Sequence, residues 1–286
     1  MMRKSVQVMS LMLACSMGAV ASSIVSASLP SKELKRDWTY TVYLPTGYET
    51  SGLNYPVLYL LHGNGGNEND WAVQGHIQAT TDALIASGEI PPTIIVMPAA
   101  GTTWYVDRKE RMESAFFNDM MPAVESKYRT IKQRDGRLVA GLSMGGYGAL
   151  RFALLKPELF QAAALLSPAI YDPVVPETSS ARRVGVFGEN TYDPAIWTAL
   201  NYPTLWDKFL EKKIAVPMYI NSGDDDDFNI EMEATRLYER LRAAKQPAEL
   251  RIVNGAHVWS VWDSTIGDAM KYMYRTVSRP VVASPK

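Results

Sequence analysis

The 286-residue chain is predicted to form an α/β domain in which a mostly parallel central sheet has helices on both faces. Short apolar runs alternate along the chain with segments of helical periodicity, an order typical of this class. Several runs are apolar throughout, as expected of strands buried on both faces. Hydrophobic residues make up 47% of the chain and charged residues 21%, which is sufficient for a large core.

The expected strands follow in chain order. Residues 39–44 (TYTVYL) alternate in polarity and stop at Pro45, which predicts an early edge strand. Residues 57–61 (VLYLL) are continuously apolar. The same theme recurs at 93–97 (TIIVM), 138–142 (LVAGL), 162–166 (AAALL), 216–222 (VPMYINS) and 250–253 (LRIV). Turn-forming or polar residues follow each of these segments.

Helical spacing fills the intervals between these strands. Helices are expected over 114–128, where Pro122 interrupts the pattern, and over 146–155, 230–244 and 261–277. Residues 168–203 contain several prolines and little periodicity, which predicts an irregular insertion that either caps a pocket or is a plain surface excursion. We therefore expect one domain over 31–280 and a frayed tail over 281–286.

The first 27 residues are predicted to be a signal peptide that is removed. Arg3 and Lys4 form a basic start, and a mostly apolar stretch follows from 6 to 20. Small residues suit cleavage after Ala21 or after Ala27. The stretch is too short to span a membrane, so we expect an exported, periplasmic or secreted protein. Lipid attachment at Cys15 is the alternative.

The charge balance and the rare residues restrict the chemistry. Lys and Arg number 29 against 30 Asp and Glu, which argues against a nucleic-acid partner. Removal of the leader takes the net charge from −1 to −3 and takes away Cys15, the single cysteine. The mature chain then has no thiol nucleophile, disulfide or cysteine metal site. Three histidines remain, at 62, 76 and 257, and nothing in the sequence indicates an oligomeric state.

Residues 141–145 (GLSMG) match the pattern G-x-S-x-G between a predicted strand and a predicted helix. In such a turn the glycines let the backbone close sharply, so that the serine is presented for attack. The following helix directs its N-terminus at developing negative charge. This position indicates that Ser143 is a nucleophile, the alternative being a glycine-rich turn with a passive serine.

A second glycine-rich loop, 62–66 (HGNGG), ends the strand 57–61. Such a loop leaves backbone N–H groups uncovered and able to face a substrate oxygen. We assign the oxyanion hole to the N–H groups of Met144 and Asn64, with Gly65 as the substitute for Asn64. His62 is expected to hold the loop in place.

The base and the acid follow from chain order. Triads built on this serine turn run Ser, acid, His, and His257 is the only histidine after Ser143. The acid is expected after the strand 216–222, where Asp224 to Asp227 offer four candidates that residue pattern alone does not separate. A solvated acidic loop and a Ca²⁺ site are alternatives for this run, although the spacing of an EF-hand is absent.

Together the segments LLHGNGGNENDW, GLSMGGYGAL, NSGDDDDF and GAHVWSVW resemble the "Putative esterase" (esterase D-like) family of α/β-hydrolases. The family includes feruloyl esterases, tributyrin-type esterases, S-formylglutathione hydrolases, enterochelin esterases and antigen 85 mycolyltransferases, and the resemblance extends from about residue 39 to 273. It implies the α/β-hydrolase fold and places the acid on Asp226, with Asp225 and Asp227 as alternatives. It also matches Asn64 to the second oxyanion donor and implies no metal or organic cofactor.

The resemblance implies a serine carboxylesterase that acts through Ser143, Asp226, His257 and an acyl-enzyme on small-molecule or carbohydrate esters, including aromatic, feruloyl-type ones. An acyltransferase with a sugar alcohol as acceptor is the alternative, followed by a binding module without activity. Aromatic residues near the predicted strand ends are expected to contact substrate, while Trp262 is expected in the core. The expected contacts are Trp71, Trp104, Tyr105, Tyr147 and Trp259.

Overall fold

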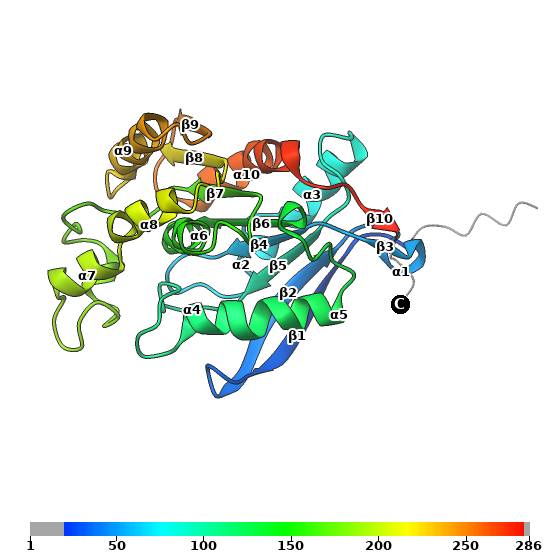
Figure 1. The fold of residues 1–286 in the computed structure, drawn as a ribbon, viewed down its shortest axis with the longest axis horizontal. Helices are drawn as coiled ribbons and strands as arrows, with labels where there is room; N and C mark the ends of the chain where they lie inside the picture. The colour runs from blue at the N-terminus through cyan, green and yellow to red at the C-terminus, as the bar shows by residue number, and fades with distance from the viewer. Residues whose placement is uncertain (1–19, 283–286) are drawn as a thin grey trace, which may run out of the picture.

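The computed structural model describes residues 20–282. An eight-stranded sheet runs through it in the order β1-β2-β5-β4-β6-β7-β8-β9 (Figure 1). β1 pairs antiparallel with β2 and β2 antiparallel with β5, and all other neighbours are parallel. The strands are β1 (Ser23–Ser31), β2 (Arg36–Leu44), β4 (Val57–Leu61), β5 (Ile94–Pro98), β6 (Arg137–Leu142), β7 (Ala162–Leu166), β8 (Met218–Gly223) and β9 (Ala248–Val253).

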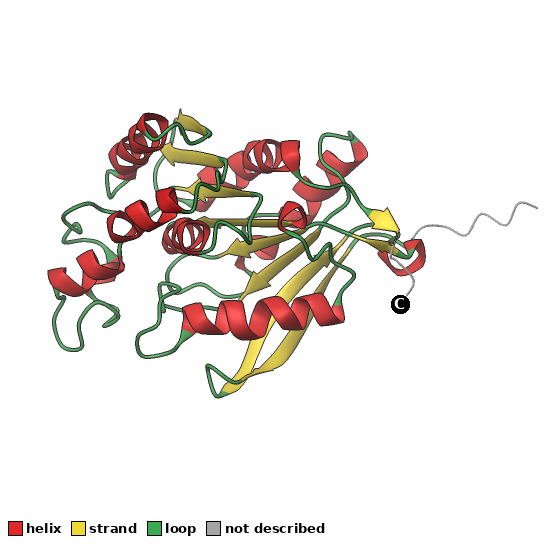
Figure 2. Ribbon diagram, in the orientation of Figure 1, coloured by secondary structure: helices red, strands yellow, loops and turns green. Residues whose placement is uncertain are grey.

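Helices cover both faces of the sheet (Figure 2). Side chains alternate along each buried strand: in β4, Tyr59 faces one core and Leu58 faces the other. α3 (Ile77–Ala86) and α10 (Trp259–Met273) pack on the Leu58 face, and α6 (Met144–Leu155) and α9 (Ile230–Ala243) pack on the Tyr59 face. This arrangement confirms the predicted class. The shorter elements are α1 (Tyr48–Ser51), β3 (Leu53–Asn54), α2 (Asp70–Val73), α7 (Pro194–Leu200), α8 (Trp206–Glu211) and β10 (Val281–Val282).

The strand expected at the sheet edge over 39–44 is instead the second strand, because β1 pairs along its outer side from Ser23 to Ser31. β1 (SIVSASLPS) mixes four serines with apolar residues and is partly exposed, and it is not among the expected strands. Part of β1 falls in the segment expected to be removed with the leader. Residues 1–19 of that segment, with Arg3, Lys4 and Cys15, lie outside the described residues.

The helix expected over 114–128 begins two residues earlier and contains a π-helical turn. α4 (Met112–Ala115) and α5 (Met121–Lys127) are joined through Phe116–Met120, and the N–H of Met121 donates to the carbonyl of Phe116, five residues back. Pro122 lacks an N–H, and its ring would collide with a carbonyl in a regular turn. The wider turn lets the helix continue through the proline.

Residues 168–203 form the first part of the connection from β7 to β8 and contain α7 and a short 3-10 turn at Ser180–Arg182, and α8 follows them before β8. Their start lies against the serine turn, since the N–H of Ala169 donates to the carbonyl of Ser143 (3.1 Å). At the other end of the chain, Val281 and Val282 pair with β3, and residues 283–286 of the expected frayed tail lie outside the described residues.

Candidate active site

Ser143 lies between the end of β6 and the first turn of α6, with φ 52° and ψ −116°. This left-handed conformation costs a non-glycine residue about 1–3 kcal/mol, so the surrounding packing has to enforce it. Two glycines make that packing possible. A Cβ on Gly145 would lie 2.5 Å from the carbonyl oxygen of Leu61, and a Cβ on Gly141 would collide with the backbone of Gly145. The predicted sharp turn therefore requires both glycines.

A chain of hydrogen bonds connects Ser143 to a buried carboxylate. His257 Nε2 lies 2.8 Å from Ser143 Oγ, and His257 Nδ1 lies 2.7 Å from Asp226 Oδ2. His257 comes from the turn after β9, and its ring is held between the edges of Phe228 and Trp262, with centroids at 4.9 and 5.0 Å. The three predicted triad residues thus meet at the edge of the sheet where the parallel strands end.

Asp226 differs from its three acidic neighbours in burial and in partners. Its side chain is fully buried, and its Oδ1 accepts from the N–H of Phe228 (3.0 Å). Asp224 bonds instead to the N–H of Gly255 (2.9 Å). Asp225 and Asp227 are exposed and make no side-chain hydrogen bond within residues 20–282. The contact to His257 therefore selects Asp226 among the four candidates.

The two backbone N–H groups assigned to the oxyanion hole have no acceptor in the described part of the chain. Met144 is the first residue of α6, where an N–H has no partner within the helix. Asn64 lies in the loop after β4 and its N–H is likewise free. The N–H of Gly65 donates to the carbonyl of Gly101 (2.9 Å), so Gly65 cannot substitute for Asn64.

His62 holds the loop that carries Asn64. The N–H of Ala100 donates to His62 Nε2 (2.8 Å), so Nδ1 carries the proton and donates to the carbonyl of Gly63 (2.7 Å). The ring is 1% exposed, and burial lowers the pKa of His62 below its ordinary value. A neutral imidazole thus bridges two loops, which is the structural role predicted for it. His76 is remote from this region and lies 3.2 Å from Asp263.

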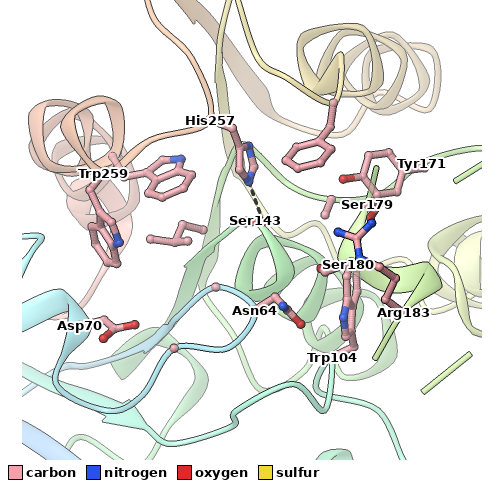
Figure 3. Close-up of a pocket in the computed structure, with 16 residues that line it drawn as sticks. Asn64, Asp70, Trp104, Ser143, Tyr171, Ser179, Ser180, Arg183, His257 and Trp259 are labelled. Carbon is pink, nitrogen blue, oxygen red and sulfur yellow. Dashed lines mark hydrogen bonds between the residues drawn. The ribbon is translucent and has the colours of Figure 1, made fainter. Parts of the chain in front are cut away.

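A pocket of about 330 Å³ opens over Ser143. Figure 3 shows Trp259 and Asp70 on one side of the serine and Tyr171 and Arg183 on the other. Trp259 lines it, as expected. Trp104 also borders it, although its side chain is 1% exposed and packs in the core against Tyr147 and Trp197. The remaining lining residues are Gly63, Asn64, Gly66, Leu142, Ala169, Ser179, Ser180, Phe228, His257 and Trp262.

Three aromatic residues expected at the substrate lie in the core instead. Trp71 is 1% exposed and donates through Nε1 to the carbonyl of Leu61 (3.0 Å). Tyr105 donates to the carbonyl of His62 (3.1 Å), and Tyr147 donates to the carbonyl of Leu200 (2.6 Å). Each ring is covered by packing, and its polar atom is used by the backbone, so these residues support the pocket from behind.

Trp262 is buried as expected, yet it also lines the pocket. Its ring is 5% exposed, lies edge-on to His257 and donates through Nε1 to Ser167 Oγ (3.1 Å). Among the lining residues that sequence reasoning did not identify as site residues, five have polar side chains. They are Asp70, Tyr171, Ser179, Ser180 and Arg183.

Neither a metal site nor a membrane helix is found in the part of the chain that the structure describes. Within residues 20–282, no group of three or more His, Cys, Asp or Glu side chains is arranged to hold a metal ion. No helix in that range has the length and the apolar character needed to cross a bilayer.

Comparison with known proteins gives the same family as the motifs. Residues 31–273 match the family model described as "Putative esterase". An endo-1,4-beta-xylanase/feruloyl esterase of Xylanibacter ruminicola is 37% identical over 145 residues, which are 47% of this chain and 20% of that protein. An acetyl esterase of Caldicellulosiruptor saccharolyticus is 24% identical over 270 residues, covering 88% of this chain and 98% of that protein.

Comparison with solved structures agrees with this family match. A ferulic acid esterase superposes with a TM-score of 0.75 and 30% identity, covering 90% of this chain and 99% of that one. An S-formylglutathione hydrolase from Agrobacterium tumefaciens has a TM-score of 0.72 at 19% identity, which supports the fold. With the α/β-hydrolase architecture and a family match over most of its length, the chain belongs to the "Putative esterase" family.

Proposed function

We propose that this protein is a serine carboxylesterase that works through Ser143, His257 and Asp226. The observation that carries the proposal is the hydrogen-bonded chain from Ser143 Oγ through the imidazole to a buried carboxylate, at the floor of an open pocket. Nucleophile, base and orienting acid within hydrogen-bond reach form the arrangement that acyl transfer requires.

The proposed reaction proceeds in two halves. Ser143 Oγ attacks the ester carbonyl carbon while its proton passes to His257 Nε2, and the carbonyl oxygen becomes an anion facing the N–H groups of Asn64 and Met144. Each donor is expected to contribute about 3 kcal/mol to this step. The protonated imidazole, stabilised by Asp226, then gives its proton to the departing alkoxide. Water repeats the sequence on the acyl-enzyme and releases the acid.

The proposed substrates are carbohydrate-linked or aromatic esters. The pocket joins two indole rings, Trp104 and Trp259, with the hydroxyl groups of Tyr171, Ser179 and Ser180. Aromatic faces and hydroxyls suit both a sugar ring and a substituted phenyl group. Two relatives, one named as an endo-1,4-beta-xylanase/feruloyl esterase and the other as an acetyl esterase, are consistent with this substrate class.

A substrate panel tests the proposal. The purified enzyme is expected to hydrolyse p-nitrophenyl acetate and methyl hydroxycinnamates, and a serine-directed fluorophosphonate is expected to label Ser143 with loss of turnover. Ser143→Ala should reduce kcat by at least about 10³-fold while the melting temperature is retained. Turnover in this variant at the wild-type rate would overturn the assignment. Product analysis with added sugar alcohols would reveal transfer in place of hydrolysis.

We also propose that the protein is exported after cleavage following Ala21. Cleavage there leaves β1 whole and keeps Ser22, whose Oγ donates to Asp82 Oδ2 (2.6 Å). Cleavage after Ala27 would remove the first five of the nine residues of β1. N-terminal sequencing of the exported protein is expected to begin at Ser22. A lipid-modified N-terminus at Cys15 would contradict this.

A further inference from the structure

The two sides of the pocket carry opposite charges. Asp70 and Trp259 lie on one side of Ser143, and Arg183 lies on the other, beside Ser179 and Ser180 (Figure 3). A permanent cation beside the attacking serine has no role in the acyl-transfer steps described above. Its position therefore requires a separate account.

The backbone of its own loop holds the Arg183 guanidinium. Nη2–H donates to the carbonyl of Thr178 (2.7 Å), and Nη1–H donates to the carbonyl of Glu177 (3.4 Å). A guanidinium has five N–H donors, so three of them remain for a ligand. The group is thus oriented before any ligand arrives, which reduces the entropy lost on binding.

No carboxylate among residues 20–282 forms an ion pair with Arg183. The side chain of Glu177 is 3.1 Å from Arg182 instead, and the carboxylate of Asp226 faces His257. Arg182 itself lies over the ring of Tyr192, with 4.6 Å between its Cζ and the ring centroid. The charge of Arg183 is therefore left without an internal counterion at the wall of the pocket.

The surroundings of Arg183 suit a small polar anion attached to an apolar body. Tyr171, Ser179 and Ser180 lie on the same side of the pocket, where Ser179 Oγ accepts from the N–H of Ala181 (3.3 Å). Trp104 and Phe228 add apolar side chains to the lining. Guanidinium groups bind carboxylates through paired, charge-assisted hydrogen bonds. A carboxylate on the substrate would satisfy the free donors and the charge together.

We propose that Arg183, with Ser179 and Ser180, forms a subsite for a carboxylate carried by the ester substrate, so that the enzyme prefers acidic esters to their neutral counterparts. The inference rests on the proposed esterase function and adds to it the charge of the substrate. The acid belongs to the half of the ester that lies on the Tyr171 side of Ser143.

Matched pairs of acidic and neutral esters test the subsite for both the acyl half and the alcohol half of the substrate. For an acid on the acyl side, the p-nitrophenyl monoesters of glutaric and adipic acid are compared with the same esters capped by methyl. For an acid on the alcohol side, 4-acetoxybenzoate is compared with methyl 4-acetoxybenzoate. In at least one pair, Arg183→Gln is expected to lower the ratio of acidic to neutral kcat/KM about fivefold, the upper end of what an exposed ion pair contributes.

Two further variants separate this subsite from general charge effects. Lys109 lines the neighbouring cavity and has no ion pair within the described residues. Lys109→Gln removes one positive charge there, and the ratio of acidic to neutral kcat/KM should stay within twofold of wild type. Arg183→Lys keeps the charge but loses the paired donors, so it should retain only part of the preference, and 0.5 M salt should weaken the preference further. An unchanged ratio in Arg183→Gln, or an equal loss for both members of every pair, overturns the proposal. Failure of the wild type to hydrolyse any ester would instead refute the esterase function itself.

Discussion

Replacement of Asp226 by asparagine is expected to abolish most activity without unfolding the protein. Asparagine has nearly the same shape, and the side chain is fully buried 2.7 Å from His257 Nδ1. The carboxylate accepts a hydrogen bond from Nδ1–H, which keeps the imidazole proton on Nδ1 and leaves Nε2 free to take the proton of Ser143. An amide that turns its NH₂ toward Nδ1 would move the imidazole proton to Nε2, where it faces Ser143 Oγ and prevents base catalysis.

The expected loss in kcat is about 10⁴-fold, the size found when the acid of a serine protease triad is changed in this way. It corresponds to about 5.5 kcal/mol in the activation free energy. Exposed Asp225 and Asp227 contact neither His257 nor Ser143, so Asp225→Asn and Asp227→Asn should keep kcat within about threefold of wild type.

Steady-state hydrolysis of p-nitrophenyl acetate measures the three variants, with active-site titration by a fluorophosphonate and thermal melting as controls for folding. A kcat above a tenth of wild type in Asp226→Asn would refute the reasoning. So would a large loss confined to Asp225→Asn or Asp227→Asn, because the acid would then lie elsewhere in the loop.

Three further changes test the packing around the site. Gly145→Ala places a Cβ 2.5 and 2.7 Å from the carbonyl oxygens of Leu61 and His62. It should lower the free energy of unfolding by about 1–3 kcal/mol and abolish activity. The control Gly267→Ala places its Cβ 3.5 Å from the nearest atom and should be tolerated. Equal denaturation midpoints for Gly145→Ala and Gly267→Ala would contradict this expectation. Tyr147→Phe should lose about 1 kcal/mol of stability and keep kcat/KM within twofold; a tenfold loss of kcat/KM would make Tyr147 a substrate contact after all. Burial lowers the pKa of His62, so the unfolded chain binds a proton there more readily, and the free energy of unfolding should fall as the pH drops below about 6.5. Denaturant titrations from pH 7 to 5 should show a shallower fall in the free energy of unfolding for His62→Asn than for the wild type. Equal dependence on pH in the two proteins would refute the contribution of His62.

The parts of the molecule that sequence predicts well are those where burial imposes a pattern. β4 and β7 have the bounds expected of them because strands buried on both faces are apolar throughout. Ser143 lies directly after such a strand, β6, so its place follows from the same pattern. His257 lies four residues after β9, a half-exposed edge strand, and chain order rather than burial identified it. β1 has no continuous apolar run: it is an edge strand that mixes four serines with apolar side chains, and its nine register pairs with β2 join the two backbones.

Side-chain direction is the information that local pattern lacks. The run Asp224 to Asp227 contains four identical residues, and only the turn after β8, with the N–H of Phe228 as a cap, decides that Asp226 faces His257. Family resemblance supplied that residue where physical reasoning left four. The aromatic residues show the same limit, since Trp71 and Trp259 both lie in segments that follow strand ends, yet Trp71 is core and Trp259 lines the pocket.

The insertion after β7 shows most clearly that local sequence pattern does not determine side-chain direction. The same insertion bears on how the site acquires substrate specificity. Arg182 and Arg183 are adjacent in sequence, but Arg182 binds the carbonyl of Val175 and covers Tyr192, while Arg183 lines the pocket. Hydrogen bonds to loop carbonyls, rather than apolar periodicity, set both directions. The groups proposed to perform the chemistry stand on turns that the sheet fixes, so substitutions in the insertion can change which ester binds while those turns keep their geometry. On this argument the charge preference of the enzyme resides in residues 179–183, and its catalytic power resides in the turns at the strand ends.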